Sequence, residues 1–284
     1  MPSSYFDPPI RHWRQLCGEF RWNIPDKFNI AHACCGRWAN DRSRFALYAV
    51  DNENCRAWSF WDIQQAANRL SNALAAMTVM AGDNVAIVMG QRAETAIAHI
   101  ACHQMGALTL PLSPSIGAEE LAERLQRTPV RIVVIDEDAL PALESIGPAS
   151  YAKYVIGVGA ARASCLRRWD DLLPLASSNY TALATNAAVP AIVGAQGDLL
   201  PQRSLLAQLP GFVCAHEFYP QNADLFWSPR AWTAPGLFGG ILSTWNFGQP
   251  VLAYRGPLDA ERAYRLMDRY GVRNLHLDED MLTA

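Results

Sequence analysis

The chain has 284 residues, half of them hydrophobic and 18% charged, and its formal net charge is −3. A chain of this length and composition can bury a sizeable core, which excludes global disorder. The small net charge gives no general attraction to nucleic acid or to an anionic membrane. No apolar run approaches the ~20 residues of a membrane span. We therefore expect no nucleic-acid partner and no membrane span.

Cysteine usage and the N-terminus indicate a compartment. The seven cysteines are odd in number and include no CxxC pair, which favours reduced thiols. The stretch MPSSYFDPPIRHW has no apolar centre of the kind found in export signals. These features predict a cytoplasmic protein. Only Lys27 and Lys153 among the 24 basic residues are lysines, so lysine chemistry is not expected after residue 153.

The first part of the chain alternates between short apolar runs and amphipathic stretches. Ser59 and Asp62 have the spacing of a capping box before a helix. Gly106 is placed to close another helix at its C-terminal end. We predict helices at 30–38, after Ser59, at 93–105 and at 118–126, and strands at 45–50, 85–89, 108–112, 131–135 and 154–158.

Residues 159–189 look irregular and are a candidate boundary, after which the alternation resumes. Strands are predicted at 190–193, 224–228, 250–254 and 274–278, and helices at 201–209, 235–247 and 258–270. This pattern predicts an α/β fold of βαβ layers with mostly parallel sheets. We divide the chain into an N-terminal arm (1–30), a first α/β subdomain (31–180) and a second, incomplete one (181–284).

The stretch from Pro190 to Leu206 is typical of a phosphate site in position but not in composition. An apolar run leads into a turn that contains Gly194, Gln196, Gly197 and Asp198, and a helix is predicted to follow. Strand, glycine turn and helix start is a frame in which backbone N–H groups hold phosphates. This turn has no lysine, serine or threonine. It has the form of a degenerate phosphate loop.

Other candidate groups each have a simpler structural interpretation. His99 and His103 lie four residues apart, a metal-binding spacing, but no third ligand is suggested and ordinary helix residues are favoured. Cysteines 34, 35 and 102 are most simply buried small residues. The pairs and clusters His216-Glu217 and Asp278-Glu279-Asp280 could serve acid–base or metal chemistry, although solvated surface charge is the commoner outcome. No metal site is therefore predicted.

Glycines occur at two further places. Gly236 and Gly239 lie at a predicted helix start. They could admit a ligand or allow the helix to pack closely on the sheet, and the sequence leaves both explanations open. The segment 157–159 (GVG) follows a strand but lacks the third glycine and the acidic residue of a dinucleotide site, so it is rejected.

Several stretches together resemble a known family. They are FNIAHACCGRWA, WSFWDIQQAANRLSNALAAM, GDNVAIVMGQRAETAIAHIACHQMGALTLPLSPSI and ADLFWSPRAWTAPGLFGGILSTWNFGQPVLAYRG. They resemble the N-terminal part of AMP-forming acyl-CoA synthetases, nearest to the acetyl-CoA and medium-chain group of the adenylate-forming superfamily. The likeness runs from about Phe28 to the last residue. It implies the partial N-terminal large domain of the adenylate-forming fold, with acyl-pocket candidates at Trp232, Gly236 and Gly239.

The resemblance implies that ATP and Mg²⁺ activate a carboxylate as an acyl-adenylate, and that coenzyme A then receives the acyl group. Family members hold the phosphates with a loop close to T-S-G-T-T-G-x-x-K-G. Here the loop reads GAQGD, without hydroxyls or lysine, and the chain ends before the family's later motifs. We therefore expect a truncated homologue that is inactive alone, with no catalytic residue assigned and no cofactor required.

Two alternatives stay open. The chain could be half of a split synthetase that a second polypeptide completes. It could instead be a pseudoenzyme that binds an acyl ligand or pairs with an intact synthetase. Exposed sheet edges would also favour self-association.

Overall fold

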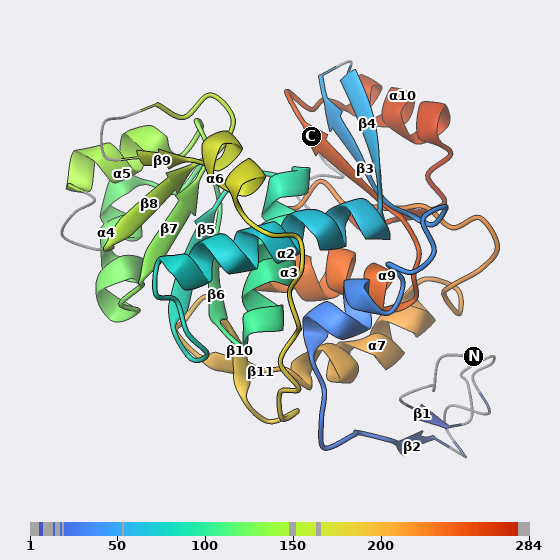
Figure 1. Cartoon of the computed structure of the whole chain (residues 1–284). Coiled ribbons are helices and arrows are strands. Elements are labelled where there is room, and N and C mark those ends of the chain that lie inside the picture. The colour runs from blue at the N-terminus through green and yellow to red at the C-terminus, as the bar shows by residue number, and fades with distance from the viewer. Residues whose placement is uncertain are drawn as a thin grey trace.

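The structure is a computed structural model that describes residues 6–7, 14, 18, 20–52, 54–147, 152–162 and 166–277. Two large sheets flank a central layer of helices (Figure 1). A separate antiparallel pair near the N-terminus joins β1 (Phe6–Asp7) to β2 (Arg21–Trp22). The predicted α/β fold with mostly parallel sheets is confirmed.

The first large sheet has seven strands in the order β11-β10-β6-β5-β7-β8-β9. Its neighbours are parallel except for β10 and β11, which form an antiparallel hairpin. The strands are β5 (Asn84–Val88), β6 (Leu108–Leu112), β7 (Ile132–Ile135), β8 (Tyr154–Gly157), β9 (Leu166–Arg168), β10 (Pro190–Val193) and β11 (Leu199–Pro201).

The second large sheet has five strands in the order β14-β12-β13-β3-β4. All neighbours are parallel except β3 and β4, which form a hairpin. The strands are β3 (Phe45–Asp51), β4 (Asn54–Ser59), β12 (Phe226–Trp227), β13 (Val251–Arg255) and β14 (Asn274–Leu275).

Helices cover both faces of the seven-stranded sheet, because side chains alternate between its faces. Val85 and Ile87 face the main core with α2 and α3, whereas Ala86 and Val88 join a second cluster under α4 and α5. The helices are η1 (His32–Gly36, a π-helix), α2 (Phe60–Ala76), α3 (Ala93–Met105), α4 (Ala118–Arg127), α5 (Leu140–Ile146), α6 (Trp169–Leu175), α7 (Ser204–Ala215), α8 (Ala234–Gly236), η3 (Leu237–Ile241, a π-helix), α9 (Leu242–Asn246) and α10 (Ala260–Tyr270).

The local signals for helix ends act as predicted. The Ser59 Oγ accepts from the Asp62 N–H at 3.1 Å, and the Asp62 carboxylate accepts from the Ser59 N–H at 2.9 Å, so the capping box of α2 is complete. Gly106 ends α3 in the left-handed region, with φ of +73°.

Each large sheet draws strands from both sides of the boundary predicted near residue 180. Strands β10 and β11 lie in the sheet that holds β5 to β9, whereas β3 and β4 lie in the sheet that holds β12 to β14. A strap over residues 176–183 runs between the two parts of the sequence and is tied to α2. Arg69 and Asn72 of α2 donate to backbone oxygens of Ala176, Ser177 and Asn179. The proposed subdomain limits stay a prediction.

Three expectations about local structure were wrong. Residues 159–189 are not uniformly irregular, since they contain β9 and α6. The helix expected from residue 201 begins at Ser204, because Pro201 pairs with Pro190 in the hairpin. The helix expected over 235–247 is interrupted by the π-helix η3, whose wider turn separates α8 from α9. In the described part of the chain no helix is both long and apolar enough to cross a bilayer.

His99 and His103 of α3 lie in the main core, with their rings stacked 5.9 Å apart between centroids. Both side chains are buried, and within the described residues none of their four ring nitrogens has a hydrogen-bond partner. Burial lowers the pKa of His99 well below its usual value and lowers that of His103 to about 3. Both rings are therefore neutral inside the fold.

This pair predicts a loss of stability in mild acid. The unfolded chain binds two protons as the pH falls below 6.5, the ordinary histidine pKa, whereas the folded chain does not. The stabilisation is present above pH 6.5 and should fall by about 4 kcal/mol in total between pH 7.5 and 5. Urea unfolding at several pH values measures it.

His99→Leu should remove about half of this pH dependence, while the exposed, non-titrating Gln126→Leu serves as the control and should leave it unchanged. An unaltered slope in His99→Leu would contradict the assignment.

Candidate functional site

The topology of the seven-stranded sheet creates a crevice at the carboxyl ends of β5 and β7. From β5 the chain passes to β6 on one side, whereas from β7 it passes to β8 on the other side. Connections that leave two neighbouring parallel strands in opposite directions leave a gap outside their carboxyl ends, where ligands of α/β proteins commonly bind. The residues that follow these two strands are Gly90 to Arg92 and Asp136 to Asp138.

Gln91 brings the second sheet to this crevice. Its buried side-chain amide donates to the backbone oxygens of Ser228 and Arg230, both at 2.6 Å, and accepts from the Tyr254 N–H at 3.3 Å. Those groups belong to β13 and to the segment that follows β12. One side chain thus satisfies three backbone groups, and the carboxyl ends of both sheets meet there.

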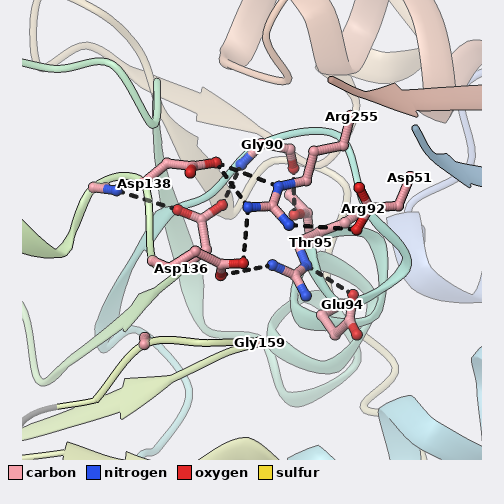
Figure 2. A network of polar contacts seen from close by, with 12 residues as sticks. Asp51, Gly90, Arg92, Glu94, Thr95, Asp136, Asp138, Gly159 and Arg255 are labelled. Carbon is pink, nitrogen blue, oxygen red and sulfur yellow. Dashed lines mark hydrogen bonds and ion pairs between the residues drawn. The ribbon is translucent and has the colours of Figure 1, made fainter. Parts of the chain in front are cut away.

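Asp136 fixes the backbone on the β5 side of the crevice (Figure 2). Its Oδ2 accepts from the Gly90 N–H at 2.8 Å, and its Oδ1 accepts from the Ala139 N–H at 3.3 Å. Thr95 adds a bond from its hydroxyl to the Gly90 oxygen at 2.6 Å. Burial raises the pKa of Asp136 above its usual value, although both backbone donors oppose the shift.

Glu137 joins two arginines from the two sheets. Its Oε2 lies 3.2 Å from Nη1 of Arg92, and its Oε1 lies 2.8 Å from Nη2 of Arg255. Burial acts to raise the pKa of Glu137, but a backbone hydrogen bond and the two guanidinium groups outweigh it, so the net shift is downward. Gly159 passes so close that a Cβ there would lie 2.6 Å from the Glu137 Oε2, with φ of +63°. Glycine is therefore required at this point.

Further carboxylates complete the network in Figure 2. Glu94 lies 2.9 Å from Nε of Arg92, and Asp138 lies 3.1 Å from Nη2 of Arg255. Beside the network is a cavity of about 260 Å³, lined by β3, β4, residues 91–94 and Arg255. Arg92 and Arg255 of its lining already pair with carboxylates, whereas the Arg56 guanidinium lies 3.8 Å from the centroid of the Trp58 ring.

The degenerate phosphate loop forms the turn of the β10–β11 hairpin and closes on itself. The Gly194 N–H donates to the backbone oxygen of Asp198 at 2.8 Å, and the Gly197 N–H donates to the backbone oxygen of Gly194 at 3.1 Å. The Asp198 carboxylate lies over Gly194, where a Cβ would meet its Oδ1 at 2.2 Å. Gln196 is exposed on the turn. The turn therefore precedes a strand, and not a helix start as predicted.

The two glycines of the expected acyl pocket differ in their surroundings. A Cβ at Gly236 would lie 2.2 Å from the backbone oxygen of Ala231, so this glycine permits close packing. A Cβ at Gly239 would meet the His276 ring at 3.7 Å, an ordinary contact. Trp232 is buried in the main core. Of the two explanations left open from the sequence, close packing fits Gly236, whereas the contact at Gly239 favours neither.

A basic cluster near Gly239 was not expected from the sequence. His276 Nδ1 lies 3.5 Å from the Gly239 oxygen, and its Nε2 lies 3.5 Å from Nη1 of Arg230. His216 lies 6.5 Å from His276 between ring centroids and is half-buried among aromatic rings, so it is not the solvated surface residue expected. Burial lowers its pKa. Glu217 is exposed, and residues 278–280 lie outside the described residues.

Sequence reasoning missed Gln91, Arg92, Glu137 and Arg255. Each follows or ends a parallel strand, so a search of the residues after every predicted strand could have found them. Within the described ranges, no group of three or more His, Cys, Asp or Glu residues is arranged to hold a metal ion.

Comparison with known proteins now identifies the chain's relatives. The family model described as AMP-binding enzyme matches residues 36–176. Mouse (Mus musculus) acyl-coenzyme A synthetase ACSM3, mitochondrial, is 21% identical over 274 residues, and human (Homo sapiens) ACSM4 is 22% identical over 250 residues. The chain is similar to AMP-binding enzymes of the acyl-CoA synthetase type. The resemblance stated from the sequence is confirmed.

The homology covers most of this chain but only part of each relative. The matches include 87% of this chain and 45% of mouse ACSM3, or 82% and 43% for human ACSM4. A crystal structure of Brucella canis acyl-CoA synthetase superposes with a TM-score of 0.86 at 20% identity, over 96% of this chain and 53% of that one. This chain therefore spans about half the length of the relatives it matches, and the superposition confirms the fold.

Gln91→Leu should destabilise the fold by about 2–4 kcal/mol, because two backbone oxygens and one N–H would be left buried without a partner. Urea unfolding measures the change. The exposed Gln126→Leu is the matched control and should stay within about 0.5 kcal/mol of the parent. A loss below about 1 kcal/mol in Gln91→Leu would show that the amide does not hold the sheets together.

Proposed function

We propose that this chain is an AMP-dependent synthetase-like protein that does not form acyl-adenylates by itself. The observation that carries the proposal is the closed 194–198 turn. It stands where the resemblance places the phosphate loop, and its amide N–H groups at Gly194 and Gly197 already donate within the turn. Backbone N–H groups that already donate within the turn are not available to bind a phosphate.

The charge in this turn is also unsuited to ATP. The Asp198 carboxylate covers Gly194, and the turn GAQGD contains no lysine or hydroxyl side chain. A negative group at this position repels the phosphates that the family's loop attracts. Losing one transition-state donor commonly lowers a rate by about 10²–10³, and here several are replaced together. The residues present in this turn do not fit ATP and Mg²⁺.

Two alternatives from the sequence stay proposals. The homology spans about half of each relative, which is compatible with a second polypeptide that completes a split synthetase. Such a partner would still have to replace the loop donors. Binding of an acyl ligand without chemistry stays a proposal for Trp232, Gly236 and Gly239, and at Gly239 a Cβ would make only an ordinary contact with His276. In that case the chain would bind acyl groups, or pair with a synthetase, as a pseudoenzyme.

ATP–pyrophosphate exchange with acetate, butyrate and octanoate tests the proposal. We expect no acid-dependent exchange above the background without acid, because the turn cannot hold the phosphates. An intact acetyl-CoA synthetase is the positive control, and a thermal melt shows that the chain is folded.

Clear acid-dependent exchange would overturn the proposal. Saturable octanoate binding by calorimetry, without exchange, would favour the acyl-binding alternative over a chain that has lost both functions.

A further inference from the structure

A second cavity, apart from the crevice, lies between η1, α2 and the 176–183 strap. Its volume is about 300 Å³, and it shares no lining residue with the cavity beside Arg92. Its polar wall contains amides of α2 and α3 and the Asn40 amide, while His32 and Tyr180 contribute from the other segments. None of the described residues that line it is Asp, Glu, Lys or Arg. This cavity is therefore neutral and polar.

The orientation of three linked amides in the wall, those of Asn68, Gln64 and Gln104, follows from one backbone oxygen. Ser178 O can only accept, so Asn68 must donate to it through Nδ2, at 2.8 Å. The Oδ1 of Asn68 therefore faces Gln64, whose Nε2 donates to it at 2.8 Å and also to Gln104 Oε1 at 2.9 Å. Gln104 Nε2 in turn donates to Ser71 Oγ at 2.6 Å. The network admits no flipped amide without losing bonds.

This orientation leaves the carbonyl oxygen of Gln64 for a ligand. Both N–H groups of Gln64 are used, and within the described chain its Oε1 accepts no hydrogen bond. Gly36, in the π-helix η1, keeps the space beside that oxygen open. A Cβ at Gly36 would lie 3.2 Å from His32 Nδ1 and 3.5 Å from Gln64 Oε1. One ligand atom near this point could reach both groups.

Aromatic side chains supply a flat apolar surface next to the amides. Trp61 and Tyr180 line the cavity, and the Arg42 guanidinium lies 4.3 Å from the centroid of the Trp61 ring in a cation–π contact. Burial raises the pKa of Tyr180, so its phenol stays protonated and neutral. π-Helical turns such as η1 often occur at functional sites, because the wider turn displaces side chains from the regular helical pattern.

We propose that this cavity binds a small neutral ligand that carries an amide N–H group on a flat apolar ring. The N–H donates to Gln64 Oε1, the imidazole of His32 completes the polar contact, and the ring lies against Trp61 and Tyr180. A charged ligand would lose its hydration with no counter-charge in the wall. An ester or tertiary amide would leave the Gln64 oxygen without a donor.

Benzamide is the probe, and its binding is measured by saturation-transfer-difference NMR titration. We expect saturable binding with a dissociation constant on the order of 1 mM, as for other ligands of this size. Gly36→Val, which fills the space, and Gln64→Leu, which removes the acceptor, should each weaken binding at least about tenfold. N,N-Dimethylbenzamide, which lacks the N–H donor, should bind the parent chain at least about tenfold more weakly.

The exposed Gln126→Leu is the control and should bind as the parent does, with thermal melts to show that each variant is folded. Absence of saturation at concentrations of roughly 20 mM would overturn the proposal. Unchanged affinity in both cavity variants, or equal affinity for the dimethyl compound, would also overturn it. ATP–pyrophosphate exchange plays no part in this outcome, so the two proposals stand or fall separately.

Discussion

The side-chain amide of Gln91 is the contact on which the relation between the two large sheets depends. It is buried and bonds to three backbone groups of the second sheet and the segment after β12. Backbone groups at strand ends must find partners when they are buried, and no regular ladder crosses from one sheet to the other. A single glutamine at the carboxyl end of β5 meets this need. The ion pairs of Glu137 with Arg92 and Arg255 then form across the same junction.

The junction also supports the proposal that the fold persists without the chemistry of its relatives. Arg92 and Arg255 bond to carboxylates of this chain, so these guanidinium groups contribute to structure without a ligand. The 194–198 turn is similar, because its Gly194 N–H donates to the Asp198 backbone oxygen and its Gly197 N–H donates to the Gly194 oxygen. Both places lie at carboxyl ends of parallel strands, where a nucleotide enzyme needs donors that remain available. Internal pairing stabilises the protein and removes those donors.

Much of the fold could be predicted because its signals are local. The capping box of Ser59 and the left-handed Gly106 each depend on a few neighbouring residues, and α3 and β6 have the bounds expected from periodicity. Strand β11 and the π-helix η3 could not be predicted in this way. Pro201 reads as a helix start, but pairing with Pro190 places it in a strand. The roles of Gln91 and Glu137 depend on which strands become neighbours, which periodicity does not specify.

The central claim is that the 194–198 turn is closed to phosphate. Backbone amide NMR signals of Gly194 and Gly197, followed during titration with ATP and Mg²⁺, test it most directly. Because both N–H groups donate within the turn, at 2.8 and 3.1 Å, we predict that their chemical shifts stay constant. Saturable shifts of these two signals, absent from a titration with Mg²⁺ alone, would contradict the account.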